Sequence, residues 1–546
     1  METLVAIGAS DRPPIVSTIS DPGTSLPPVF YEDHINRAPT TQHLDWTVTA
    51  DDIRPDGVLK RVYLINGLFP GPTLEALSGD TLIINVTNAL HDVPITIHWH
   101  GIHISNAMDG VAGVTQCAIP PGSSFIYNVS IPADQSGTFW YHAHAGLARA
   151  DGLYGGLVVH APASAPDVVS KDPQEKDMLL LIGDWYHQPA EEVMEWYMQP
   201  ESFGNEPVPD SLLVNGAGRF NCSMAVPARP VDCVEQHTMS LPYLHPGEGT
   251  YRVRIANTGA LTGLTLTFEN LDVTLIAVDS IAVDPLDAPH PSSLGVLYPG
   301  QRMDVLLRQS AGQVTTDSSS ASALKIDLDE ECFKYPNLAL TPTQIFPISP
   351  PLSTPSQAQE VKPTSKNINI HKIPSPHHIQ QTLPPNPSTT AVVYTKIQKL
   401  AIRHNAPYGF FNGTSWLPQR EPHVPVAALA RELWDENQFG HGHHFYILST
   451  HESLTGWGSY NPFTTSSNPS SQSKSDSDLD LTQAMLRDTV YIPRRGHAVL
   501  RFKADNPGVW LFHCHILWHL GSGMGMLVDV GGYHDTNGVS GEVCSV

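Results

Sequence analysis

The chain is patterned as short runs in which apolar residues alternate with polar ones or gather as β-branched stretches. Alternation with a period of two is typical of a strand with one buried face. Turn residues, mainly Gly, Pro, Asn and Asp, separate these runs at the spacing of an antiparallel sandwich. In the first part of the chain the runs are residues 58–65, 81–87, 94–100, 124–129 and 156–160.

A second set of strands follows and carries no cluster of metal-binding residue types. Its runs are residues 178–185, 212–215, 251–257, 264–268, 273–278 and 302–307. We therefore expect a second sandwich with a scaffolding role. Strands resume near residue 391 and continue to the end. Two helical candidates, residues 190–197 and 427–433, are too short to change the prediction of an all-β protein.

Length and local composition divide these sets. At 546 residues the chain is too long for one core, and about 150 residues per domain suggests three or four domains. Residues 1–42 are rich in Pro, Ser, Thr and Asp, and we expect them to be loosely ordered. Residues 346–390 have the composition of an extended connection. The predicted domains are residues 43–165, 176–345 and 391–546.

Charge and sequence signals restrict partners and location. A net charge of -24 argues against a nucleic-acid partner, and no apolar stretch is long enough to cross a bilayer. Sequons at Asn85, Asn128, Asn221 and Asn412 permit glycosylation in a secretory route. The N-terminus, however, lacks the pattern of a signal peptide. Either the protein is intracellular, or this N-terminus is not that of the full precursor.

The candidate chemistry is concentrated near the C-terminus. In an extended segment successive side chains point to opposite faces, so Cys514 faces away from His513 and His515. One strand can therefore serve two metal sites. Cys514, His519 and Met524 supply thiolate, imidazole and thioether, the ligand set of an electron-transfer copper. An inert cysteine among satisfied histidines is the alternative, but a short apolar strand rarely needs three histidines.

Two more histidine pairs lie in the first set of strands. His98 with His100, and His142 with His144, are spaced so that each pair places two imidazoles on one strand face. A shared site for several metal ions requires that arrangement. Either pair alone is equally consistent with a structural role. Together with the C-terminal histidines, they favour a multi-metal site.

These motifs resemble those of the multicopper oxidases, and of fungal laccase-like members in particular. The motifs that carry the resemblance are His98-Trp-His100-Gly, Trp140-Tyr-His142-Ala-His144, Gly440-His-Gly-His-His-Phe and His513-Cys-His-Ile-Leu-Trp-His519. The resemblance implies three cupredoxin-like Greek-key β-sandwich domains and four copper ions. It also implies a monomer that takes single electrons from a small aromatic reductant and reduces dioxygen to water at a trinuclear cluster.

The resemblance also implies a role for each site residue. Cys514 and His519 would bind the mononuclear copper with Met524 axial, and His98 would bind the type 2 copper. The ligands of the type 3 pair would be His100, His142, His144, His441, His513 and His515.

Two carboxylates complete the implied site. Asp109 resembles an acid that assists proton delivery to oxygen, although a turn-forming Asp before Gly explains it equally well. Asp210 resembles a carboxylate that accepts a phenol proton, and a plain loop Asp is the competing interpretation.

The third-domain motif departs from the family pattern. Members carry His-Pro-x-His-x-His-Gly-His-x-Phe, but here Glu436 and Phe439 occupy two ligand positions, one for the mononuclear and one for the type 2 copper. A deletion or a misread splice boundary is the simplest account, and true divergence is the alternative. Loss of these imidazoles should weaken copper binding. A slip of two residues would preserve facing and move His441 to the type 2 position and His443 to a type 3 position.

The remaining cysteines allow two bridges. The resemblance implies a pair between Cys117 and Cys544, while Cys222 and Cys233 could close a local loop; sequence alone does not fix connectivity.

Three functions are compatible with these features. The first is oxidation of phenolic or related aromatic substrates. The second is ferroxidase activity, which would need acidic residues aimed at the mononuclear site. The third is a copper-binding homologue that no longer turns over because two ligand histidines are missing.

Overall fold

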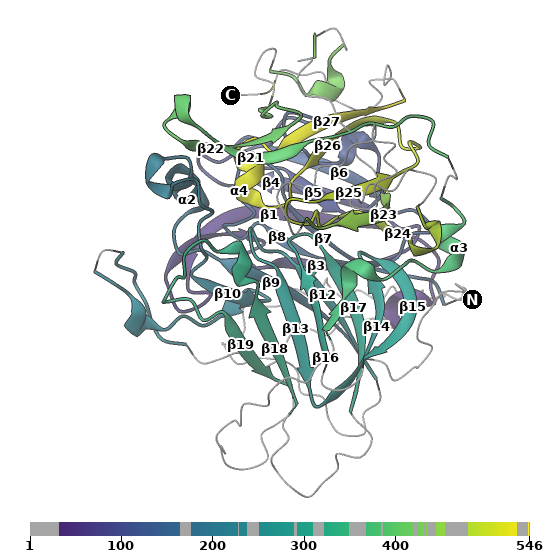
Figure 1. The fold of residues 1–546 in the computed structure, drawn as a ribbon, viewed down its shortest axis with the longest axis horizontal. Helices are drawn as coiled ribbons and strands as arrows, with labels where there is room; N and C mark the ends of the chain where they lie inside the picture. The colour runs from purple at the N-terminus through teal and green to yellow at the C-terminus, as the bar shows by residue number, and fades with distance from the viewer. Residues whose placement is uncertain are drawn as a thin grey trace, which may run out of the picture.

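The computed structural model describes residues 32–163, 176–227, 229–236, 250–288, 292–309, 322–348, 367–383, 386–418, 423–430, 433–434, 444–453, 479–531 and 544. These residues form mostly strands, which confirms the all-β prediction (Figure 1). The helices among them are α1 (Glu32–Ile35), α2 (Ala190–Tyr197), α3 (His377–Gln380) and α4 (Leu517–Gly521). In this part of the chain no helix has the length and apolar character needed to span a bilayer.

The first sandwich has two four-stranded sheets. One has the order β2 (Lys60–Ile65), β1 (Thr41–Ile53), β4 (Thr81–Asn88) and β6 (Ser124–Ser130). The other has the order β3 (Gly71–Leu77), β8 (Tyr154–His160), β7 (Gly137–Ala143) and β5 (Ile97–His100). In β4 buried and half-buried residues alternate, as its sequence predicts. β7 and β8 are buried throughout, because residues of the second sandwich such as Leu179 and Leu181 cover their outer face.

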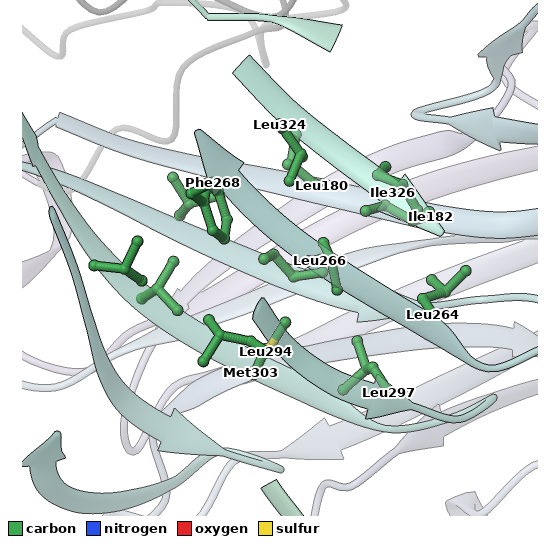
Figure 2. Close-up of a cluster of buried hydrophobic side chains, with 14 of the residues drawn as sticks. Leu180, Ile182, Leu264, Leu266, Phe268, Leu294, Leu297, Met303, Leu324 and Ile326 are labelled. Atoms are coloured by element: carbon green, nitrogen blue, oxygen red, sulfur yellow. The ribbon is translucent and has the colours of Figure 1, made fainter. Parts of the chain in front are cut away.

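The second sandwich packs a seven-stranded sheet on a five-stranded sheet. The larger sheet consists of β11 (Ala217–Gly218), β10 (Ser211–Val214), β9 (Lys176–Trp185), β12 (Tyr251–Asn257), β17 (Arg302–Gln309), β14 (Leu271–Val278) and β15 (Ile281–Ala288). The smaller consists of β19 (Thr343–Pro347), β18 (Ala323–Leu328), β13 (Leu264–Glu269), β16 (Ser292–Leu297) and β20 (Asn367–Asn369). Figure 2 shows aliphatic side chains from both sheets, among them Ile182, Leu266 and Ile326, filling the space between them.

The C-terminal part has smaller sheets. They are β21 (Thr395–Leu400) with β22 (Ala406–Phe411), β24 (Met485–Arg487) with β23 (Phe445–His451) and β25 (His497–Arg501), and β26 (Gly508–His513) with β27 (Gly525–Val530). β26 lies against the first sandwich, where Asn106 Nδ2 donates to Val509 O at 2.6 Å. Segments from opposite ends of the chain are thus neighbours, as the green and yellow ribbons beside the purple ones show (Figure 1).

Both predicted disulfides are present. Cys117 bonds to Cys544, and Cys222 bonds to Cys233. Cys332 and Cys514 are free. The first bridge ties the C-terminal tail to the first sandwich across 427 residues of sequence.

One buried guanidinium connects all three parts of the molecule. Arg302 of β17 is 0% exposed; its Nε donates to Thr138 O in β7 at 3.1 Å. Its two Nη atoms donate to the carboxylate of Asp488, which follows β24, at 2.7 and 2.6 Å. Burial alone would raise the pKa of Asp488, but Arg302 outweighs it and holds that pKa well below its usual value. The second sandwich therefore positions strands that carry histidines of the first and third parts.

A second buried network reinforces this contact. Arg254 of β12 donates to Asp177 at 2.8 and 2.7 Å and to Asp304 at 3.2 Å, and Thr138 Oγ1 donates to Asp304 at 2.6 Å. Burial raises the pKa of Asp304, but the guanidinium groups of Arg252 and Arg254 outweigh burial and hold it below its usual value. Asp304 is therefore ionised at neutral pH and paired with cations.

Replacing Arg302 by Met should destabilise the fold strongly, because Asp488 would lose its charged partner while staying buried. We expect a loss of about 3–5 kcal/mol in the free energy of unfolding, measured by urea denaturation. The control is Arg61→Met, whose pair with Asp52 is 58% exposed on both sides and should cost less than about 1 kcal/mol. Equal losses in the two variants would contradict a special role for Arg302.

The Asp304 network should make stability depend on acidic pH. The pKa of Asp304 in the folded protein lies below the unfolded value of about 3.9. The stabilisation that its ion pairs contribute is therefore complete above that pH and is lost as pH falls through the folded pKa. Asp304→Asn should therefore melt at a lower temperature than the wild type at neutral pH. The difference in melting temperature between the two proteins should become smaller below about pH 4, where a protonated Asp304 resembles Asn. A gap that stays constant with pH would contradict this.

Candidate metal centre

Strands β5 and β7 bring two histidine pairs together. They pair antiparallel with His98 opposite His142, and alternation places both pairs on one face. The ring centroid of His98 lies 5.3 Å from that of His142 and 5.4 Å from that of His144. His98, His100 and His142 offer ring nitrogens that all lie within 4.8 Å of one another. The spacing seen in the sequence thus produces one cluster.

The C-terminal histidines complete this cluster. His513, the last residue of β26, has Nε2 3.2 Å from His144 Nε2. His515 Nε2 lies 3.2 Å from His100 Nδ1. Six imidazoles from opposite ends of the chain therefore converge; we call His98, His100, His142, His144, His513 and His515 the histidine cluster.

The cluster is chemically suited to a metal ion. Burial, with neighbouring cations, holds the pKa of His142, His144 and His515 well below the usual value, and burial lowers that of His100 to about 3. Imidazole binds metals in its neutral form. His142 Nε2 is buried and has no hydrogen-bond partner in the described part of the chain. An orphaned nitrogen beside other imidazoles is better satisfied by a shared cation than by a proton.

Backbone and carboxylate groups orient the rings. His142 Nδ1 lies 3.0 Å from Ala143 O, and His513 Nδ1 lies 2.9 Å from Cys514 O. His98 Nδ1 lies 2.8 Å from Asp109 O and 3.2 Å from Asp109 Oδ1. Such bonds fix the tautomer and leave Nε2 for a metal. Burial lowers the pKa of His98, but Asp109 outweighs it and raises that pKa overall.

Cys514 faces a second group of ligands. Its Sγ lies 3.5 Å from His519 Nδ1, and Met524 packs beside it in a small core with Phe411 and Phe512. The turn is held by Cys514 N donating to Met524 O at 3.0 Å and Met524 N donating to His519 O at 2.9 Å. The thiol, imidazole and thioether predicted from the sequence therefore lie together.

The sequence analysis missed the carboxylate beside His519. His519 Nε2 lies 3.0 Å from Glu206 Oε1, whose side chain is 26% exposed. Burial lowers the pKa of His519, but Cys514 and Glu206 outweigh it and raise that pKa to about 10. Asp210, predicted for this place, instead accepts from the backbone N–H of His187 at 2.9 Å. The loop after Gln199 turns in a way that the sequence pattern does not reveal.

Arg149 and Asp488 were also missed. Arg149 Nη1 lies 2.7 Å from His515 Nδ1, and its Nη2 donates to His515 O at 2.9 Å. Asp488 Oδ1 lies 3.6 Å from His100 Nε2, and its Oδ2 lies 3.7 Å from His444 Nε2. These charged groups come from segments without a motif. Glu436, Phe439, His441 and His443, on which the departure from the family pattern rests, lie outside the described residues.

One cavity of about 1350 Å³ adjoins both groups of ligands. Its walls include Glu206, His519 and Cys514 at one place and His98, His100 and His144 at another. Cys514 is peptide-bonded to both His513 and His515. The geometry can therefore take a small molecule beside His519 and carry charge along a short covalent path to the histidine cluster.

Comparison with known proteins gives the same family along the chain. Models described as multicopper oxidase match residues 47–164, 176–316 and 440–532. An L-ascorbate oxidase of Cucurbita pepo var. melopepo is 30% identical, over 90% of this chain and 94% of that protein. Laccase-2 of Cryptococcus neoformans var. grubii is 28% identical, over 93% of this chain and 88% of that protein.

Iron-transport relatives and solved structures extend this picture. Iron transport multicopper oxidase fetC of Epichloe festucae is 30% identical, over 89% of this chain and 76% of that protein. The laccase from Botrytis aclada superposes with a TM-score of 0.67 at 25% identity, over 93% of this chain and 90% of that chain. Fet3p superposes with a TM-score of 0.71 at 23% identity, over 93% of this chain and 97% of that chain. The chain therefore belongs to the multicopper oxidases, three-domain cupredoxin-like enzymes that use copper.

Proposed function

We propose that this oxidase takes single electrons from phenolic or related aromatic substrates beside His519, and that dioxygen is reduced to water at the histidine cluster. The observation that carries the proposal is the Glu206 carboxylate, 3.0 Å from His519 Nε2 on the wall of the cavity. A phenol that loses an electron becomes strongly acidic, and a carboxylate in this place can accept its proton.

The protonation state of Glu206 supports this role. Burial raises its pKa, but the hydrogen bond and charge of His519 outweigh burial, Lys399 adds to their effect, and the net shift is downward. Glu206 is therefore ionised at neutral pH and ready to accept a proton. The contact between Glu206 Oε1 and His519 Nε2 also orients the imidazole, so that His519 Nδ1 faces Cys514.

The ligand assignment follows from the two groups of donors. Cys514, His519 and Met524 would hold the mononuclear copper. His98 would hold the type 2 copper, and His100, His142, His144, His513 and His515, with His441 from outside the described residues, would hold the type 3 pair. Bound copper would supply one-electron acceptance beside His519 and dioxygen reduction at the cluster. The chain supplies the path, since Cys514 is bonded to two cluster histidines.

Asp109 has a separate role in this proposal. It contacts His98 through both its backbone and its carboxylate oxygen, and it lines the cavity. A carboxylate there can hold a proton near the place where oxygen is reduced. We propose that Asp109 both orients His98 and passes protons to the cluster.

Ferrous iron is the less favoured substrate. Its capture would require several carboxylates near His519, yet across the described ranges the one group of three ligand-type side chains within 4.8 Å is His98, His100 and His142. Lys399 acts on Glu206 electrostatically, and its side chain packs so closely on Gly204 that a Cβ there would lie 2.7 Å from Lys399 Cε. The positive charge of Lys399 acts against the capture of a divalent cation by Glu206 and does not act against a neutral phenol.

Copper content should separate the two sites. Cys514→Ser should lose the intense visible absorption of a thiolate-bound copper and its share of metal, while His142→Ala should keep that absorption and lose cluster copper. Elemental analysis and absorption spectra measure both, with exposed His91→Ala as the control. Full copper content in His142→Ala would contradict the assignment. Unchanged copper content in His443→Ala would remove the proposed two-residue slip.

Glu206→Gln should separate electron transfer from proton transfer. In oxygen uptake with a phenol, we expect kcat/KM to fall about 10²-fold, because the proton acceptor is lost. Uptake with ferrocyanide, which gives an electron without a proton, should change little.

The matched control is Asp210→Asn, whose carboxylate is bound to His187 away from the cavity. Equal losses with phenol and ferrocyanide would contradict the role of Glu206. Turnover of ferrous iron but not of phenols would favour a ferroxidase. A fully copper-loaded protein inert towards both would favour a homologue that no longer turns over.

A further inference from the structure

Two tyrosines stack on the wall of the cavity. Tyr298 follows β16 and Tyr491 follows β24; their ring centroids are 4.5 Å apart and their planes differ by 10°. His371 lies against both rings, 5.7 Å from Tyr298 and 5.4 Å from Tyr491. Both tyrosines line the cavity and are partly exposed. The pair therefore joins the second and third parts of the molecule with two oxidisable rings.

A carboxylate is placed to receive the phenolic proton. Tyr298 OH donates to Asp329 Oδ2 at 3.2 Å, and Asp329 also lines the cavity. Burial, with the neighbouring tyrosine, raises the pKa of Tyr298, so the phenol is protonated at rest. Oxidation of a phenol requires release of this proton, and a carboxylate at hydrogen-bond distance makes the release local.

Each tyrosine is joined to the histidine cluster by a short stretch of chain. Two residues after Tyr298, Gly300 packs on His515, and an added Cβ would lie 2.9 Å from His515 Cδ2. Two residues before Tyr491, Thr489 Oγ1 lies 3.4 Å from His100 Nε2. Both connections lead to histidines of the cluster that reduces oxygen, and neither passes through His519.

We propose that Tyr298, with Asp329 as proton acceptor and Tyr491 as its stacked partner, is an internal electron donor to the histidine cluster. It acts when no reductant is bound beside His519, and this inference rests on the proposed function. The O–H bond of Tyr298 breaks, its proton passes to Asp329 Oδ2, and one electron passes to the oxygen-reducing centre, for which dioxygen is the oxidant. A tyrosyl radical remains, shared with Tyr491. The next reductant molecule returns the electron, and Asp329 returns the proton.

The test follows the radical directly. Full-length Cys514→Ser protein of measured copper content, which would hold only the three cluster coppers, is reduced, freed of excess reductant, mixed with dioxygen and frozen for electron paramagnetic resonance. Three cuprous ions supply three of the four electrons that dioxygen takes, so the fourth must come from the chain. We expect an organic radical that narrows when tyrosine carries ring deuterium, and that is lost in Tyr298→Phe. Tyr394→Phe is the matched control, since Tyr394 lines the same cavity and is 57% exposed. It lies directly before β21, away in sequence from Tyr298 and Tyr491. Asp329→Asn should slow radical formation about 10²-fold.

A second measurement keeps this inference separate from the proposed function. Flash-generated tris(bipyridyl)ruthenium(III) oxidises the same full-length variants without dioxygen, and it should give a radical that again depends on Tyr298 and Asp329. If phenol oxidation fails, this measurement still decides the role of Tyr298. A radical undiminished in Tyr298→Phe, or no radical by either route when Tyr298 is present, would overturn the proposal. So would a radical lost in Cys332→Ser instead, because Cys332 Sγ lies 3.8 Å from the same Asp329 oxygen.

Discussion

The buried charge of Arg302 is the constraint on which the metal centre depends. A guanidinium with no exposed surface is tolerated only when its donors are paired, and here the partners come from three parts of the chain. Thr138 lies near the start of β7, which carries His142 and leads into His144, and Asp488 lies beside His100. Imidazoles must converge to within a few ångströms to share metal ions. One rigid ionic contact between domains therefore fixes relative positions that loop connections alone would leave free.

The alternation of side chains along one strand joins the two groups of ligands. Cys514 faces His519 and Met524, while its neighbours on either side face the histidine cluster. Charge accepted at the cavity wall can therefore reach the cluster through a few covalent bonds. Separation of the two groups also allows a substrate that gives one electron at a time to serve a reaction that consumes several.

The periodicity of the sequence predicted the features that depend on local backbone geometry, namely strands and the spacing of histidines. It did not predict the features that depend on contacts between distant parts of the chain. Each run predicted for the first two sandwiches coincides at least in part with a strand, and the two members of each histidine pair share a strand face because their spacing dictates it. β7 has no alternation to detect, since it is covered on both sides. Glu206, four residues before the predicted Asp210, is the carboxylate that contacts His519, and no sequence pattern shows which of the two the loop places there. Arg302 and Asp488 are 186 residues apart, and no local pattern connects them.

The second sandwich, which carries no metal-ligand motif, nevertheless supplies the residues that would set the chemistry. Glu206 stands where an organic reductant would bind, Tyr298 and Asp329 line the same cavity, and Arg302 holds the domains together. Metal ligands are restricted to the few side chains whose donor atoms bind copper. A carboxylate or phenol on a scaffold loop can change without loss of the metal. Substrate preference in this chain should therefore depend more on its second domain than on its histidine motifs.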